Sequence, residues 1–202
     1  MDQRLRILKE SGQMFAKYGI RSITMDHIAN ELGISKRTLY ETFKDKDDLV
    51  QQAIEEGTRL HKKLCQATIL KSENVIDAIF SILRVNNDTF SKMNPLFFED
   101  LKKYHSQIYL RIQEKGDIRD QKITLLLLER GVAEGIFSSL IDMKIVNAFV
   151  HKMMDMAHSE EFFDFSKKDL SKAVFFPYLY GISTNKGREL ITNYLQDFNN
   201  NL

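Results

Sequence analysis

Hydroxyl-bearing and cationic side chains gather within one short stretch of the chain. Ser35, Thr38 and Thr42 carry hydroxyls, and Lys36 and Arg37 directly follow the first of them. Short hydroxyl donors and cationic groups are the side chains that bind the phosphates and base edges of double-stranded DNA. Cations in the first turn of a helix oppose its dipole, so this placement does not favour helix stability. An external anion would remove that conflict.

Further residues extend this set on both sides. The ring of Tyr40 can lie at the edge of a core while its hydroxyl reaches a phosphate, and Lys44 and Lys46 bracket the start of the next expected helix. We therefore expect DNA contacts from Thr24, Ser35, Lys36, Arg37, Thr38, Tyr40, Thr42, Lys44 and Lys46.

Two short helices joined by a tight turn must position these side chains. Thr24 is a typical cap for a helix over 25–32, and Ser35 for a helix over 36–43. Gly33 allows the chain to reverse between them. This pattern predicts a helix-turn-helix, whose second helix can enter the major groove. Two helices with a glycine turn also occur in proteins that do not bind DNA.

Helical spacing of apolar residues dominates the rest of the 202-residue chain, which holds only two prolines and nine glycines. The sequence therefore predicts an all-α fold. Besides the two short helices, the expected helices cover residues 2–18, 46–67, 73–92, 95–115, 118–136, 142–158, 167–183 and 186–199.

Composition and motifs exclude several classes of protein. The formal net charge is +1, so DNA binding must come from local charge placement. The single cysteine, Cys65, permits no intrachain disulfide, which leaves a buried thiol or a redox sensor. The histidines lack the Glu-x-x-His and HExxH patterns, and Gly-rich phosphate loops and cysteine clusters are missing, so we expect no catalytic residues, no metal and no cofactor. Without a signal-like or membrane-length apolar run, we expect a soluble cytoplasmic protein.

Residues 7–50 resemble the DNA-binding domain of the tetracycline-repressor (TetR) family of regulators. The resemblance implies a phosphate contact for Thr24 and a backbone contact for Lys46. It also implies recognition-helix contacts for Ser35, Lys36, Tyr40 and Thr42. The matching features, in order and without a gap, are Ile7-Leu8, Phe15, Gly19, Thr24, Ile28-Ala29, Leu32-Gly33-Ile34-Ser35, Thr38-Leu39-Tyr40, Phe43, Lys46 and Leu49.

Two residues depart from the family pattern. Arg37 stands where the family often has glycine, and its guanidinium can read a guanine edge. Glu41 stands where many members carry an aromatic or neutral residue. Its carboxylate can accept from a cytosine amino group, or it faces away from the phosphates.

Two later helices are apolar on nearly every side. Residues 174–180 have almost no polar face, and residues 145–154 are similar. A helix of this kind must be buried all round, which favours a four-helix interface in a homodimer. The alternative is that both helices are central in a monomer. We expect the interface residues to be Phe149, Met153, Phe175, Tyr178 and Leu179, with a kink at Pro177.

Aromatic residues with a few polar groups mark the helices in between. They are typical of a small-molecule pocket, although aromatic residues at helical spacing are more often core. The candidate pocket residues are Phe80, Asn87, Phe90, Phe97, Tyr104, Tyr109 and Phe137.

Together these features predict a three-helix DNA-binding domain over residues 1–46 and a helical ligand-sensing and dimerisation domain over 47–202. The leading hypothesis is a ligand-responsive repressor that binds a palindromic operator as a homodimer and is released by a small, largely apolar effector. The alternative is an accessory regulator or activator controlled by a protein partner without a small-molecule ligand. An enzyme is not expected.

Overall fold

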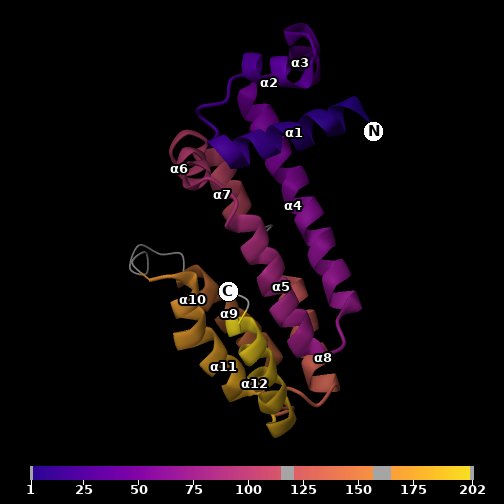
Figure 1. Cartoon of the computed structure of the whole chain (residues 1–202), viewed down its shortest axis with the longest axis vertical. Helices are drawn as coiled ribbons and strands as arrows, with labels where there is room; N and C mark the ends of the chain where they lie inside the picture. The colour runs from indigo at the N-terminus through magenta and orange to yellow at the C-terminus, as the bar shows by residue number, and fades with distance from the viewer. Residues whose placement is uncertain (1, 115–120, 157–164, 201–202) are drawn as a thin grey trace. The chain divides into compact units, whose positions relative to one another are not determined.

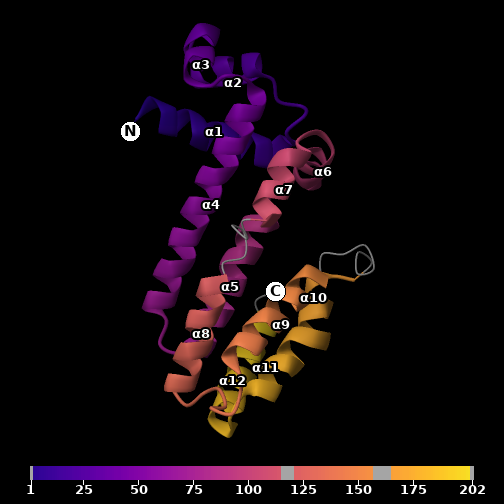
Figure 2. The ribbon, with the colours of Figure 1, turned by 180° about the vertical axis from the view of Figure 1, so that it is seen from behind.

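The computed structural model describes residues 2–114, 121–156 and 165–200 and confirms the all-α prediction. Figures 1 and 2 show the helices from two opposite sides. Within the described residues, extended pairing is limited to a bridge between Phe137 and Ser183. No helix in those ranges combines the length and apolar character that a membrane crossing requires. The α-helices are α1 (Gln3–Tyr18), α2 (Met25–Leu32), α3 (Lys36–Thr42), α4 (Lys46–Lys71), α5 (Val75–Phe90), α6 (Pro95–Tyr104), α7 (Ser106–Glu114), α8 (Gln121–Ala133), α9 (Met143–Met156), α10 (Lys167–Leu170), α11 (Phe176–Ile182) and α12 (Asn185–Asn200).

The chain packs as two compact units. Unit 1 comprises Met1–Cys65 and Val85–Ile118, and unit 2 comprises Gln66–Arg84 and Arg119–Leu202. Helices α4 and α5 therefore each contribute residues to both units. These two units are defined by how the chain packs. The boundary expected at residue 46 instead separates a DNA-binding domain from a ligand-sensing domain, and it stays a prediction.

The core of unit 1 joins the first four helices. Phe15 of α1, Ile28 of α2, Leu39 of α3 and Leu49 of α4 are all fully buried. They belong to one hydrophobic cluster that also includes residues of α6 and α7. Because each short helix places an apolar side chain in this cluster, burial fixes the orientation of α2 and α3.

The helix expected over 95–115 is interrupted at His105. That residue has φ −128° and ψ 43°, which ends α6. Its carbonyl accepts from the N–H groups of Ile108 and Tyr109, which start α7. Its Nδ1 lies 3.0 Å from Asp47 Oδ1, so a contact between distant segments accompanies a break that local periodicity did not predict.

The helix expected over 167–183 is also divided. A π-helical turn over Ser171–Phe175 separates α10 from α11, and Pro177 is in the first turn of α11. The Phe176 N–H donates to the Ser171 carbonyl, five residues back. Since proline has no N–H to continue the α-helical pattern, the wider turn replaces the simple kink predicted there.

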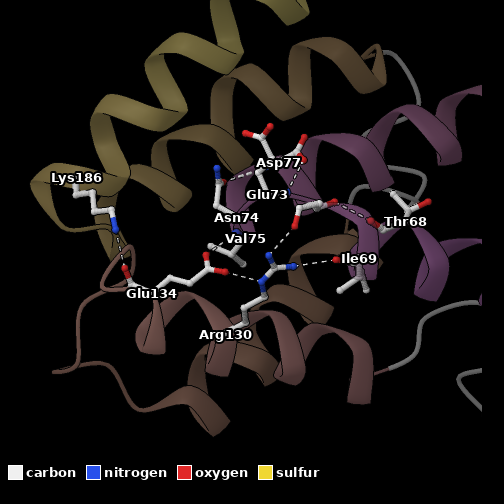
Figure 3. A network of polar contacts seen from close by, with 10 residues as sticks. Thr68, Ile69, Glu73, Asn74, Val75, Asp77, Arg130, Glu134 and Lys186 are labelled. Carbon is white, nitrogen blue, oxygen red and sulfur yellow. Dashed lines mark hydrogen bonds and ion pairs between the residues drawn. The ribbon is translucent and has the colours of Figure 1, made fainter.

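A polar network in unit 2 joins the end of α4, the start of α5 and α8 (Figure 3). Arg130 of α8 donates to the carbonyls of Ile69 (2.9 Å) and Ser72 (2.8 Å), which the end of a helix leaves without intrahelical partners. Its Nε also donates to Glu134 Oε1 at 2.6 Å. The other oxygen of Glu134 accepts from the Val75 N–H at 2.7 Å, in the first turn of α5. One ion pair thus satisfies two helix ends.

We predict that Arg130→Met lowers the free energy of unfolding by about 2 kcal/mol, because the carbonyls of Ile69 and Ser72 and the Oε1 atom of Glu134 each lose the donor that Arg130 supplies. Arg188→Met is the matched control, since Arg188 is exposed and makes one 3.3 Å bond to the Tyr180 carbonyl. Chemical denaturation measures both. Equal losses for the two variants would contradict the role assigned to Arg130.

Candidate nucleic-acid interface

Local hydrogen bonds define the turn between α2 and α3. Thr24 Oγ1 accepts from the His27 N–H at 3.1 Å, and Ser35 Oγ accepts from the Thr38 N–H at 3.0 Å, so both predicted caps are confirmed. Gly33 has φ +65°, a left-handed conformation that favours glycine. The Ile34 N–H donates to the Ala29 carbonyl, which closes the end of α2.

Helix α3 has an apolar side and a polar side. Leu39 is fully buried, and Phe43, which follows the helix, is 1% exposed. The exposed residues of α3 form two rows one turn apart: Lys36 with Tyr40, and Arg37 with Glu41. Tyr40 is 52% exposed, more than a ring at the edge of the core would be. The polar rows therefore face away from the core of unit 1.

Most polar groups on α3 have partners within the chain. Lys36 pairs with Asp26 of α2, and Arg37 Nε lies 2.8 Å from Glu41 Oε1. The hydroxyls of Ser35 and Thr38 are 2.8 Å apart. Thr42 Oγ1 donates to the Thr38 carbonyl, also at 2.8 Å. These contacts hold the side chains in defined positions while leaving Lys36, Arg37 and Glu41 exposed.

The residues before α4 form a reciprocal cap. The Asp48 N–H donates to Asp45 Oδ1 at 2.9 Å, and the Lys44 N–H donates to Asp48 Oδ2 at 3.0 Å. Asp45 therefore caps the start of α4. The Lys44 side chain is exposed, whereas Lys46, in the first turn of α4, is partly buried.

Lys46 has an acidic neighbour that the sequence did not predict. Burial lowers the pKa of Lys46, while the carboxylates of Asp100 and Asp47 act in the opposite direction. Asp100, in α6, is 9% exposed and accepts from the Arg21 N–H at 2.7 Å. Its position in the apolar stripe of α6, beside Leu101, was the available signal.

A comparison with known families matches this part of the chain. The family model described as bacterial regulatory proteins, tetR family, matches residues 7–53. The N-terminal part of the chain is therefore similar to bacterial regulatory proteins of the tetR family. The resemblance over residues 7–50 is thereby confirmed.

Two curated relatives extend the likeness beyond this region. The uncharacterised HTH-type regulator YvaF of Bacillus subtilis is 32% identical over 109 residues, which cover 53% of this chain and 56% of YvaF. The HTH-type transcriptional repressor KstR2 of Mycolicibacterium smegmatis is 24% identical over 169 residues, 73% of this chain and 74% of KstR2. The match thus spans about half of the first relative and three quarters of the second.

A solved structure shows the same fold over nearly the whole chain. It is a TetR-family regulator from Marinobacter aquaeolei, 21% identical, with a TM-score of 0.66. The match covers 98% of this chain and 99% of that one.

The candidate pocket residues are divided between the two units. In unit 2, Phe80 is fully buried and stacks on Phe176, with ring centroids 5.5 Å apart. Phe137 is 2% exposed. A groove of about 350 Å³ in unit 2 is lined by Lys172, Phe176, Pro177, Tyr180 and Leu195, and none of the candidate pocket residues lines it.

The other candidates belong to unit 1. Phe97 is 7% exposed within its core, and Tyr109 is partly buried against it. Tyr104 is 44% exposed, and its hydroxyl accepts from Arg21 Nη1 at 2.9 Å. The Asn87 side chain is exposed. Only some of these residues therefore face an interior, and a ligand role for the set stays a prediction.

Phe90 has polar neighbours that sequence reasoning missed. The His61 ring lies 5.6 Å from the Phe90 ring, and His61 Nε2 is 3.0 Å from Asn86 Oδ1. Cys65 Sγ is 3.6 Å from the same nitrogen. Burial raises the pKa of the Cys65 thiol, which disfavours the reactive thiolate. The His61 cluster, which lies within unit 1, consists of His61, Cys65, Asn86 and Phe90. The pair Asn86-Asn87 on an otherwise apolar α5 was the available signal.

The candidate dimer residues differ in their exposure. Phe149 is 53% exposed, and its ring centroid is 5.3 Å from that of Tyr178. Met153 and Phe175 are partly buried, while Leu179 is 3% exposed and belongs to the core of unit 2. Burial raises the pKa of the Tyr178 hydroxyl.

Ser35 caps α3 and is also a candidate DNA contact, and two substitutions test its capping role. We predict that Ser35→Ala lowers the free energy of unfolding by about 1 kcal/mol, because the Thr38 N–H loses its acceptor. Ser35→Asp keeps an acceptor and should retain wild-type stability. Thermal or urea unfolding of the two variants measures the difference, and an equal loss in both would contradict the capping role.

Proposed function

We propose that this chain is a transcriptional repressor that binds a palindromic operator as a homodimer and is released by a small, largely apolar effector. The observation that carries the DNA-binding part is that α3 exposes a polar side while its apolar side is buried. Leu39 and Phe43 fix the helix to unit 1, and Lys36, Arg37 and Tyr40 are left exposed. The relative KstR2 is named as a transcriptional repressor, which supports repression over activation.

The geometry of α3 supports contacts of two kinds. Its N-terminal end carries Lys36, next to the backbone amides of its first turn, and this combination favours phosphate. Arg37 and Tyr40 lie further into the exposed rows, where side chains of a recognition helix reach base edges or sugar-phosphate. The predicted contacts of Thr24, Lys44 and Lys46 belong to this proposal as backbone contacts.

An exposed apolar face of unit 2 supports the homodimer. Ile145 and Phe149 of α9 are 68% and 53% exposed, and Val174 in the π-helical turn is 43% exposed. Contiguous apolar side chains of this kind mark protein–protein interfaces. A twofold dimer would present two α3 helices to successive major grooves, which are about 34–36 Å apart.

The decisive experiment selects bound duplexes from a random pool. We expect enriched sites with two inverted half-sites whose centres are about 10 base pairs apart. Phe149→Glu should give a monomer in sedimentation and weaken operator binding at least tenfold, since it places a charge in the interface. Leu140→Glu is the matched control, because Leu140 is 93% exposed and lies outside α9 and α11. If no sequence is enriched, even at low salt, the proposed function is wrong.

The His61 cluster supports a site for the effector. It combines an aromatic ring, a buried thiol and two hydrogen-bonding side chains between α4 and α5. Pockets for small ligands place a few hydrogen-bonding groups beside apolar side chains, and the cluster supplies groups of both kinds. An apolar molecule with one hydrogen-bonding group would meet His61 or Asn86 at its polar end.

Decanoic acid and decanol, as probes of this chemistry, test the effector site. We expect at least one of them to raise the melting temperature of the wild-type protein and to release it from the selected operator. His61→Leu should abolish that rise, while His27→Leu, which changes an exposed histidine of α2, should retain it. A rise that persists in His61→Leu would exclude the His61 cluster as the site.

A further inference from the structure

The recognition helix carries an acidic residue at a place that DNA should disfavour. Glu41 is 60% exposed on α3, in the same row as Arg37, whose side chain is 86% exposed. A carboxylate near the phosphates of a duplex is repelled, so an exposed Glu on this side weakens binding to DNA in general. Glu41 does not face away from this row, because its Oε1 lies 2.8 Å from Arg37 Nε.

Helix stability does not account for the pair. Exposed ion pairs one turn apart contribute little to folding and are screened by salt. The order within the pair is also the less favourable one, since the cation precedes the anion and opposes the helix dipole. The pair instead fixes the position of the Arg37 side chain. Glu41 binds the Nε of Arg37, which keeps the two terminal nitrogens of the guanidinium for another acceptor.

The two groups have complementary chemistry toward one kind of base pair. The terminal nitrogens of an arginine donate to N7 and O6 of guanine, and a glutamate accepts from N4 of cytosine. Residues four apart in a helix are separated by about 6 Å along its axis, so both can reach the same base pair or adjacent pairs. The other ion pair of α3, between Lys36 and Asp26, joins two helices and lacks the guanidinium fork.

We propose that Arg37 and Glu41 act as one reading unit that selects a G·C base pair in each operator half-site. Arg37 supplies the contact to guanine. Glu41 positions Arg37, accepts from cytosine and penalises duplexes that offer no such donor. Glu41 therefore increases discrimination more than affinity. The proposal rests on the proposed operator binding and adds to it the base pair that is read.

The test measures dissociation constants for three duplexes: the selected operator, a changed operator and a random duplex. In the changed operator, the G·C pair that is invariant among the selected half-sites is replaced by A·T. The discrimination ratio is the dissociation constant of the changed operator divided by that of the selected operator. For the wild-type chain we expect the change to weaken binding tenfold or more. Arg37→Ala should reduce this ratio to below about threefold. Glu41→Gln should reduce the ratio as well and bind the random duplex several-fold more tightly, because the repulsion is gone.

Glu56→Gln is the matched control, since Glu56 pairs with Arg59 on α4 and not on α3. It should leave every ratio at the wild-type value, and circular dichroism should show the same melting for all variants. Selected half-sites without a constant G·C pair, or a Glu41→Gln ratio equal to wild type, would overturn the reading unit while leaving operator binding intact. Absence of wild-type binding to any duplex would instead overturn the proposed function.

Discussion

The burial of Leu39 and Phe43 is the constraint on which the DNA-binding surface depends. Helix α3 spans only Lys36–Thr42, and a helix of that length is not stable in water by itself. Leu39 is fully buried and Phe43 is 1% exposed, so packing supplies the stability that helix propensity cannot. The same packing determines which side of α3 faces outward. The polar rows are therefore a consequence of the core and not of their own contacts.

Charge placement on α3 is more balanced than its basic residues suggest. Lys36 is paired with Asp26, and Arg37 with Glu41. With a formal net charge of +1 for the whole chain, strong general attraction to phosphate is not built into the protein. Such a surface favours discrimination between sequences over tight binding to any duplex, because the carboxylates of Asp26 and Glu41 offset the attraction of these cations to phosphate.

Features set by neighbouring residues could be predicted from the sequence, and features set by distant contacts could not. The caps at Thr24 and Ser35 and the left-handed Gly33 depend on a few adjacent positions, so residue type determined them. The contact of His105 with Asp47 and the acidic neighbour of Lys46 join segments more than fifty residues apart in sequence. Helical periodicity shows which side of a helix is buried but not against which helix.

The same limit explains why the polar neighbours of Phe90 could not be predicted. Aromatic residues were grouped by type, yet Phe80 and Phe137 are core of unit 2, while Phe90 faces His61 in unit 1. The partners of His61 lie on α5, which no spacing rule on α4 reveals.

The His61 cluster is well placed to influence α3 through one continuous helix. His61 and Leu49 both lie on α4 within unit 1, about 18 Å apart at the rise of an α-helix. Leu49 is fully buried in the same cluster as Leu39. Because a packed helix moves as a body, a molecule that displaced His61 would also disturb the packing that orients α3. An effector would change operator affinity if it bound more tightly to the protein with His61 displaced than to the protein with His61 in place. The ratio of these two affinities limits the change in operator affinity.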